Sequence, residues 1–299
     1  MVNTFIKFPL AFCFLLLACM ANAQVPGNER QATRLTDTNY LDGGDLCPNN
    51  YSAKFHHHIV LIDSTSPLRE DQIDWVRRML FSEGALSEMA PWDRLTIMRL
   101  GGIQPSSNKP LFSKCRPRNG SEQGHAIDKA NIYRENKSML ERVYNQLFVD
   151  EIEKTLLKIK NNEYDQPPTI NNSPILEQIK EISRLRDLDF GSGSGYETRR
   201  LTIVSDLTQN SERLPFYDVC PGNRKCPSWE VFKNDKKYRL WAQAIEPKFG
   251  KGMDVRLMYL NTFFDSNLTK NILPFWEAYF SDNEIKLDGK IDARGFKSN

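Results

Sequence analysis

Two aspartates in the sequence each stand at the end of an apolar run, where the side chains of a sheet could do chemistry. Asp63 ends the run that starts at His58. Thr65 and Ser66 follow closely, and Asp206 ends a second run of the same kind. Continuous apolar runs are typical of parallel strands that are buried on both faces. Ligands of open α/β sheets bind just outside the carboxyl ends of the strands. We therefore expect a functional site here if the two strands are neighbours.

These residue types suit a hard divalent cation. Ser173 joins the set, because it precedes Pro174 at the predicted start of a helix, where we expect it to be the N-cap. Carboxylate and hydroxyl oxygens are ligands of Mg²⁺ and Ca²⁺, which also retain waters. Two facing carboxylates otherwise repel and raise a pKa, and a cation relieves that repulsion. The predicted metal ligands are Asp63, Thr65, Ser66, Ser173 and Asp206. In the alternative interpretation, the two aspartates only cap helix N-termini and loop amides.

Three adjacent histidines at the start of the first strand also invite a metal interpretation. Neighbouring residues of a strand point to opposite faces, so only His56 and His58 share a side, while His57 faces the other way. They lie at the end of the strand opposite Asp63. We therefore interpret them as residues that cover the lower rim of the sheet.

Strand and helix patterns alternate along the chain. Apolar residues at helical spacing, such as Ile73, Val76 and Leu80, predict the helices. Helices are expected at about 69–82, 129–160, 175–185, 228–245 and 275–280, and strands at 58–63, 93–100, 111–115, 201–206 and 253–260. The short segment 111–115 is expected to be an antiparallel edge strand. The alternation predicts a doubly wound α/β fold, with a mostly parallel sheet and helices on both faces.

The sequence divides into a leader and one large domain. Lys7, an apolar core of about 13 residues and the ending Ala21-Asn22-Ala23 are typical of a cleaved export signal over 1–23. That core is shorter than the roughly 20 residues that a membrane-spanning helix needs. We expect a periplasmic or secreted protein, with a lipoprotein anchored at Cys19 as the alternative. Residues 24–54 are predicted to be a polar lead-in, 55–281 the α/β domain and 282–299 a polar tail.

Charge and cysteine content narrow the function classes. Removing the leader takes away Lys7 alone, so 39 basic residues remain against 38 acidic residues. A near-zero net charge gives no reason to expect nucleic acid or an anionic membrane as a partner. The four remaining cysteines, outside the leader, are Cys47, Cys115, Cys220 and Cys226. In an exported protein they predict two disulfides, for which three pairings are open.

The order of these elements and motifs resembles a von Willebrand factor A-type domain over most of residues 55–281. The resemblance implies a metal-ion-dependent adhesion site, in which a partner's carboxylate completes the coordination of the metal. Asp63 and Thr65 match the first two places of the family's Asp-x-Ser-x-Ser loop. Ser173 matches the second-loop hydroxyl, where the family has Thr, and Asp206 matches the third-loop acid.

Two further positions depart from the family pattern. Pro67 stands at the place of the second loop serine, with Ser66 next to it, and Leu207 stands where Gly is common. The same topology brings Cys47 and Cys115 to the lower rim, and Cys220 and Cys226 into one upper loop. It therefore implies the pairings 47–115 and 220–226.

The resemblance implies an exported protein-binding module, for adhesion or as a scaffold, and not an enzyme. Mg²⁺ or Ca²⁺ is its expected cation, and an acidic side chain of another protein is the expected partner group. One alternative is a metal-dependent phosphoester hydrolase with Asp63 as nucleophile, although Thr65 stands where such enzymes carry a second acid. Another alternative is a structural subunit of a cell-envelope assembly with a vestigial metal site.

Overall fold

The computed structural model describes residues 35, 38, 44–48, 55–65, 67–83, 85–100, 109–122, 136–163, 173–185, 188, 196–220, 226–249, 253–260 and 266–292. The predicted export signal and Ser66 lie outside these residues, as does most of the predicted lead-in. None of the helices in the described ranges is both long enough and apolar enough to cross a membrane.

One sheet organises the described part of the chain. Its six strands lie in the order β3-β2-β1-β4-β5-β6, and all neighbours are parallel except β3, which runs antiparallel to β2. This confirms the predicted mostly parallel sheet and its antiparallel edge strand. The strands are β1 (Phe55–Asp63), β2 (Arg94–Leu100), β3 (Phe112–Cys115), β4 (Tyr196–Ser205), β5 (Met253–Tyr259) and β6 (Lys286–Asp292).

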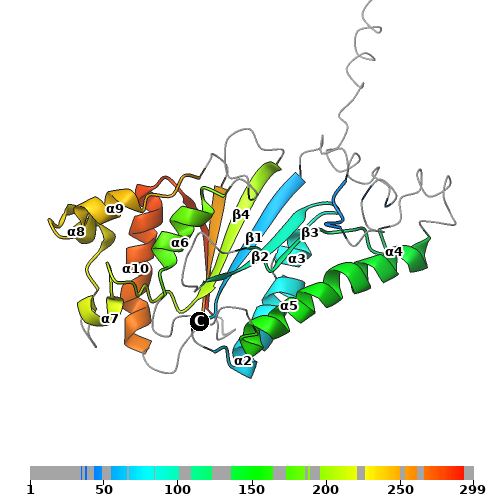
Figure 1. Ribbon diagram of the computed structural model, residues 1–299, viewed down its shortest axis with the longest axis horizontal. Helices are drawn as coiled ribbons and strands as arrows, with labels where there is room; N and C mark the ends of the chain where they lie inside the picture. The colour runs from blue at the N-terminus through cyan, green and yellow to red at the C-terminus, as the bar shows by residue number, and fades with distance from the viewer. Residues whose placement is uncertain are drawn as a thin grey trace, which may run out of the picture.

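Helices cover both faces of the sheet (Figure 1). On one side lie α2 (Glu70–Arg78), η4 (Met79–Glu83), α3 (Ala85–Glu88), α4 (Lys137–Val143), η7 (Tyr144–Val149) and α5 (Asp150–Asn161). On the other lie α6 (Ile175–Ile182), α7 (Phe216–Val219), α8 (Trp229–Asn234), α9 (Arg239–Ala244) and α10 (Ser266–Asp282). The sequence predicted this layering, because a strand without polar positions needs apolar cover on both sides.

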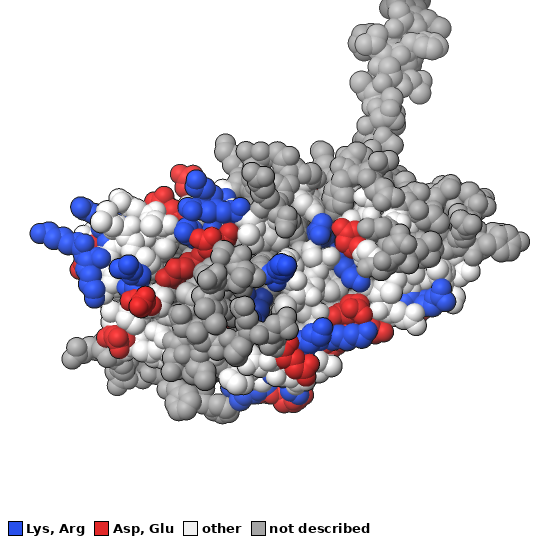
Figure 2. All heavy atoms as spheres, in the orientation of Figure 1, with Lys and Arg blue, Asp and Glu red and all other residues white. Residues whose placement is uncertain are grey.

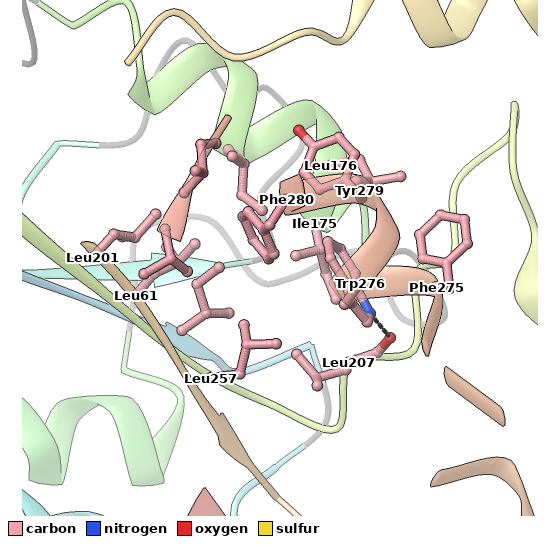
Figure 3. Close-up of a cluster of buried hydrophobic side chains, with 14 of the residues drawn as sticks. Leu61, Ile175, Leu176, Leu201, Leu207, Leu257, Phe275, Trp276, Tyr279 and Phe280 are labelled. Atoms are coloured by element: carbon pink, nitrogen blue, oxygen red, sulfur yellow. Dashed lines mark hydrogen bonds between the residues drawn. The ribbon is translucent and has the colours of Figure 1, made fainter. Parts of the chain in front are cut away.

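Alternate residues of β1 pack into two separate hydrophobic cores, one on each face of the sheet. Ile59 and Leu61 pack with α6 and α10, whereas Val60 and Ile62 pack with α2 and α5. Figure 3 shows the first core, in which Leu61 and strand residues beside it face aromatic side chains of α10. There, Trp276 Nε1 donates a hydrogen bond to the carbonyl oxygen of Leu207 at 3.0 Å. The loop that follows β4 is therefore fixed to α10.

The lead-in contributes to the core, which its polar composition did not indicate. Leu35 and Leu46 are fully buried and pack with the α2 and α5 core. A disulfide joins Cys47 to Cys115 at the end of β3, and the amide of Cys115 donates to the carbonyl oxygen of Asp45 at 2.7 Å. The other disulfide joins Cys220 to Cys226. Both pairs are those that the topology implied.

The predicted tail contains a strand. β6 pairs in parallel with β5 and so extends the sheet by one edge strand. The segment Lys286-Leu287-Asp288-Gly289-Lys290-Ile291-Asp292 carries only two apolar residues, so it does not show the apolar run on which the other strands were predicted. Charged residues are common on edge strands, because they discourage pairing with a further chain.

Candidate functional site

The site lies where β1 and β4 end side by side. The two strands are parallel, with Ile62 opposite Val204, so Asp63 comes level with Ser205. Ser205 Oγ donates a hydrogen bond to Asp63 Oδ2 at 2.6 Å, and both residues are buried. Sequence reasoning did not select Ser205. The sequence signal for Ser205 is its position directly before Asp206, which makes it the last residue of β4.

Ser173 reaches the same carboxylate from the segment before α6. It forms an isolated bridge with Asn210, in the loop after β4. Its hydroxyl donates to Asp63 Oδ2 at 3.2 Å. The sequence predicted Ser173 as the N-cap of α6, but Pro174 holds that position. The Oε1 of buried Gln209 instead accepts a bond from the amide of Leu176 at 2.9 Å, which leaves the Ser173 hydroxyl for the site.

Thr65 completes the shell around Asp63. Its Oγ1 donates to Asp63 Oδ1 at 2.6 Å and its amide donates to the same oxygen at 3.0 Å. Asp63 therefore accepts bonds from three residues on both of its oxygens. Ser64 is also buried here, and its hydroxyl has no hydrogen-bond partner among the described residues. The predicted ligand Ser66 lies outside the described part of the chain.

Asp206 lies next to this shell and is partly exposed. Its Oδ1 accepts a hydrogen bond from the amide of Thr208 at 2.8 Å. Burial raises the pKa of Asp206 to about 7, with a further contribution from the nearby charge on Asp63. The structure thus brings Asp63, Thr65, Ser173 and Asp206 together. The sequence predicted this on the condition that the two strands are neighbours, and β1 and β4 are neighbours.

Tyr217, in α7, adds an aromatic side chain that sequence reasoning missed. Burial raises the pKa of its phenol, and the charges on Asp206 and Asp63 raise it further, so the phenol lies near both acids. The side chain is nevertheless 60% exposed. No local pattern distinguishes it, because the loop after β4 brings α7 back toward the strand ends.

Leu207 holds the third loop in an unusual backbone conformation. Its φ is 58°, in the left-handed region that a leucine rarely adopts. Its amide donates to Ser205 Oγ at 2.9 Å, its carbonyl accepts from Trp276, and its side chain is fully buried. This conformation is the one that glycine adopts without strain.

The arrangement offers oxygen ligands and little else. No group of three or more His, Cys, Asp or Glu residues in the described ranges is arranged to hold a metal ion. The set at this edge instead consists of two carboxylates and the hydroxyls of Thr65, Ser173 and Ser205. This chemistry fits Mg²⁺ or Ca²⁺ with retained waters.

Comparison of the chain with models of known protein families finds no match, and comparison with curated proteins finds no relative. The resemblance to von Willebrand factor A-type domains therefore stays a prediction, based on the order of the elements and on the residues that match the motif.

Proposed function

We propose that this protein is an exported binding module that holds an acidic group of a partner protein through a divalent cation at the ends of β1 and β4. The observation that carries the proposal is the convergence of three hydroxyls on Asp63, with the second acid Asp206 beside it. Two close acids repel each other when both are ionised. A divalent cation would remove that repulsion, and the hydroxyl oxygens would complete a set of hard ligands.

Within this proposal each residue has a distinct task. Asp63 and Asp206 supply the negative charge. Ser173 and Ser205 stand on the Oδ2 side of Asp63 and Thr65 on the Oδ1 side, so their hydroxyl oxygens would join the ligand shell. The exposed Tyr217 lies at the rim, where its hydroxyl could donate to the partner's carboxylate. A cation held by these residues would bind the partner's carboxylate as a further oxygen ligand.

The general character of the protein agrees with this proposal. Two disulfides are compatible with an oxidising compartment, and we propose a periplasmic or secreted location. Basic and acidic side chains are interspersed over the described part of the face seen in Figure 2. Interspersed charge on this described part of one face favours recognition at a local site there over long-range electrostatic attraction.

Calorimetric titration tests the metal step. The oxidised protein without residues 1–23 is titrated with Mg²⁺, Mn²⁺ and Ca²⁺, alongside the variants Asp63→Ala and Asp71→Ala. Asp71 is a matched control, because it is an exposed acid of α2 whose ion pair is with Arg69. We expect saturable binding that Asp63→Ala abolishes and Asp71→Ala leaves unchanged.

Other outcomes would change the interpretation. No binding up to millimolar concentration would leave Asp63 and Asp206 as structural caps, and would favour a structural subunit with a metal-free interaction surface. Turnover of a phosphate monoester by the metal-loaded protein, lost in Asp63→Ala, would instead indicate the hydrolase.

A further inference from the structure

The amino ends of β1, β4 and β5 border a cavity that the proposed metal site does not use. Its volume is about 170 Å³. His58 lies five residues before Asp63 on β1, which corresponds to about 16 Å along an extended strand. A ligand in this cavity would therefore bind independently of a cation at Asp63. The lining comes from these three strands and from α3, and it includes His56, His58, Glu88, Thr198, Arg200 and Asp254.

Strand register places the polar side chains of the lining together. His58, Arg200 and Asp254 are direct neighbours across β1, β4 and β5. His56 and Thr198 form the next pair on β1 and β4. Because side chains alternate along a strand, these residues point to the same side of the sheet. Thr198 is exposed, so the cavity opens to solvent beside this pair.

His58 is the residue that indicates a ligand. It is only 6% exposed, and neither of its ring nitrogens has a hydrogen-bond partner among the described residues. Its neighbours differ in this respect, since His57 Nε2 lies 2.9 Å from Thr96 Oγ1 and His56 Nδ1 bonds to Thr198 Oγ1. Buried polar groups are nearly always hydrogen-bonded. An unpaired imidazole that lines a cavity therefore points to a ligand with a complementary polar group.

The ion pairs of the lining leave one acid without a close partner. Glu88 pairs with Arg200 and also with Arg256, beside the cavity, which holds both guanidinium groups at the α3 wall. Asp254 has one ion-pair partner in the described part of the chain, Lys286, whose Nζ lies 4.0 Å away on a side chain that is 74% exposed. An exposed pair of this kind stabilises little. The charge of the lining that remains uncompensated is therefore the negative charge of Asp254, which favours a cation.

His58 and Asp254 are close enough for one ligand atom to contact both. They lie two strands apart, so about 10 Å separates their backbones, and the two side chains extend into that distance from the same face of the sheet. Burial lowers the pKa of His58 to about 3, together with the charges of Arg200, His56 and Arg256. The ring is thus neutral at pH 7, and one of its nitrogens can accept a hydrogen bond.

We propose that this cavity binds a short alkylammonium ion, whose N–H groups donate to the Asp254 carboxylate and to a ring nitrogen of His58. An ammonium group has three hydrogens to donate and needs no fixed coordination geometry. This fits the lining better than a metal ion does, since no group of three or more His, Cys, Asp or Glu residues in the described ranges is arranged to hold one. The volume of the cavity limits the alkyl chain to a few carbon atoms.

Titration with propylammonium chloride tests the proposal. The oxidised protein without residues 1–23 is labelled with ¹⁵N-histidine, and its imidazole resonances are followed at pH 7, at constant ionic strength and with a chelator present. An alkylammonium keeps its charge at this pH. We expect propylammonium to shift the His58 resonances in a saturable manner. 1-Propanol, which has the same shape without the charge, and tetramethylammonium, which has the charge without an N–H, should not.

Two variants of the cavity give independent tests. Asp254→Asn keeps the shape of the side chain and removes its charge, so it should weaken propylammonium binding about 10- to 100-fold. His58→Phe keeps a buried ring without an acceptor and should weaken binding about 10-fold, as followed by the His56 resonances. Asp218→Asn removes an exposed acid of α7, and Asp63→Ala removes the acid of the proposed metal site. Both should leave propylammonium binding unchanged.

Three results would overturn the proposal. One is a response to propylammonium that stays linear to about 100 mM, which would show that the cavity has no specific affinity for it. Another is saturation by 1-propanol at the same concentration, which would show that the charge is not recognised. The third is unchanged propylammonium affinity in Asp254→Asn, which would place the bound ion elsewhere on the protein.

Discussion

Substituting Asp206 with asparagine should make the stability of the protein less sensitive to pH. The folded pKa of this carboxyl is about 7, against an ordinary value of 3.8. The folded protein therefore keeps a proton that the unfolded chain releases near pH 4. Because the folded state binds more protons between these values, the free energy of unfolding falls as pH rises from about 4 through about 7. The asparagine side chain carries no titrating proton, so this contribution disappears from the Asp206→Asn variant.

The magnitude follows from the difference of about three pKa units. At about 1.4 kcal/mol per unit, the ceiling is roughly 4 kcal/mol at pH values well above 7. Asp206 is partly exposed, and screening by water reduces the effect to about 2 kcal/mol. We therefore expect Asp206→Asn to be about 2 kcal/mol more stable than the parent at pH 8.5 and nearly equal to it at pH 4. Asparagine keeps the Oδ1 that accepts from the amide of Thr208.

Urea unfolding followed by tryptophan fluorescence measures this effect. Trp92, Trp229 and Trp276 are fully buried, so their emission reports global unfolding. The measurement runs from pH 4 to pH 8.5 in the presence of a chelator. Asp218→Asn is the matched control, since Asp218 is an exposed acid in α7 of the same loop, and it should not alter the pH profile beyond a constant offset. A constant difference between Asp206→Asn and the parent at every pH would refute the reasoning.

Three further predictions concern single contacts. Ser205→Ala should destabilise the protein by about 1–3 kcal/mol in urea unfolding, because buried Asp63 Oδ2 and the amide of Leu207 both lose a partner; an unchanged midpoint would contradict the hydrogen bonds described. In the chain-entropy account, a disulfide stabilises the protein more when it closes a longer loop. Removing Cys47–Cys115, which spans 68 residues, should lower the free energy of unfolding by about 4 kcal/mol, and removing Cys220–Cys226, which spans 6, should lower it by about 2 kcal/mol. Equal losses in paired Cys→Ser variants would argue against the chain-entropy account. His58→Phe should raise the free energy of unfolding by about 1 kcal/mol, because it removes unpaired buried nitrogens. His57→Phe should lower the free energy of unfolding, because it breaks the contact with Thr96. A lower free energy of unfolding in both variants would show that His58 has a structural partner.

The sheet was predictable from the sequence because its central strands are buried on both faces. The second halves of β1 and β4 are apolar runs, and the helices between them show apolar residues at helical spacing. The two aspartates could be placed at the strand ends for the same reason. Whether the two strand ends meet depends on the order of the strands in the sheet. The sequence does not give that order, and the structure places β1 beside β4.

The features that the sequence did not predict correctly depend on contacts between distant segments of the chain. Ser173 had the sequence context of an N-cap, but Gln209 from the loop after β4 supplies the capping oxygen. Tyr217 reaches the site only because its loop turns back, and a propensity argument carries no information on that turn. β6 is an edge strand held by its pairing with β5 and contains few apolar residues, so its sequence resembles that of a loop.

The adjacency of β1 and β4 also constrains the order of events during folding. Asp63 and Ser205 are 142 positions apart, and Asp63 and Ser173 are 110 apart. β2, by contrast, pairs with β1 across a much shorter loop, with His57 opposite Arg94. Closing a longer loop costs more chain entropy and slows the formation of the contact. We therefore expect β1 and β2 to associate first, and the hydroxyl shell of Asp63 to assemble late, as one of the last elements of the native state.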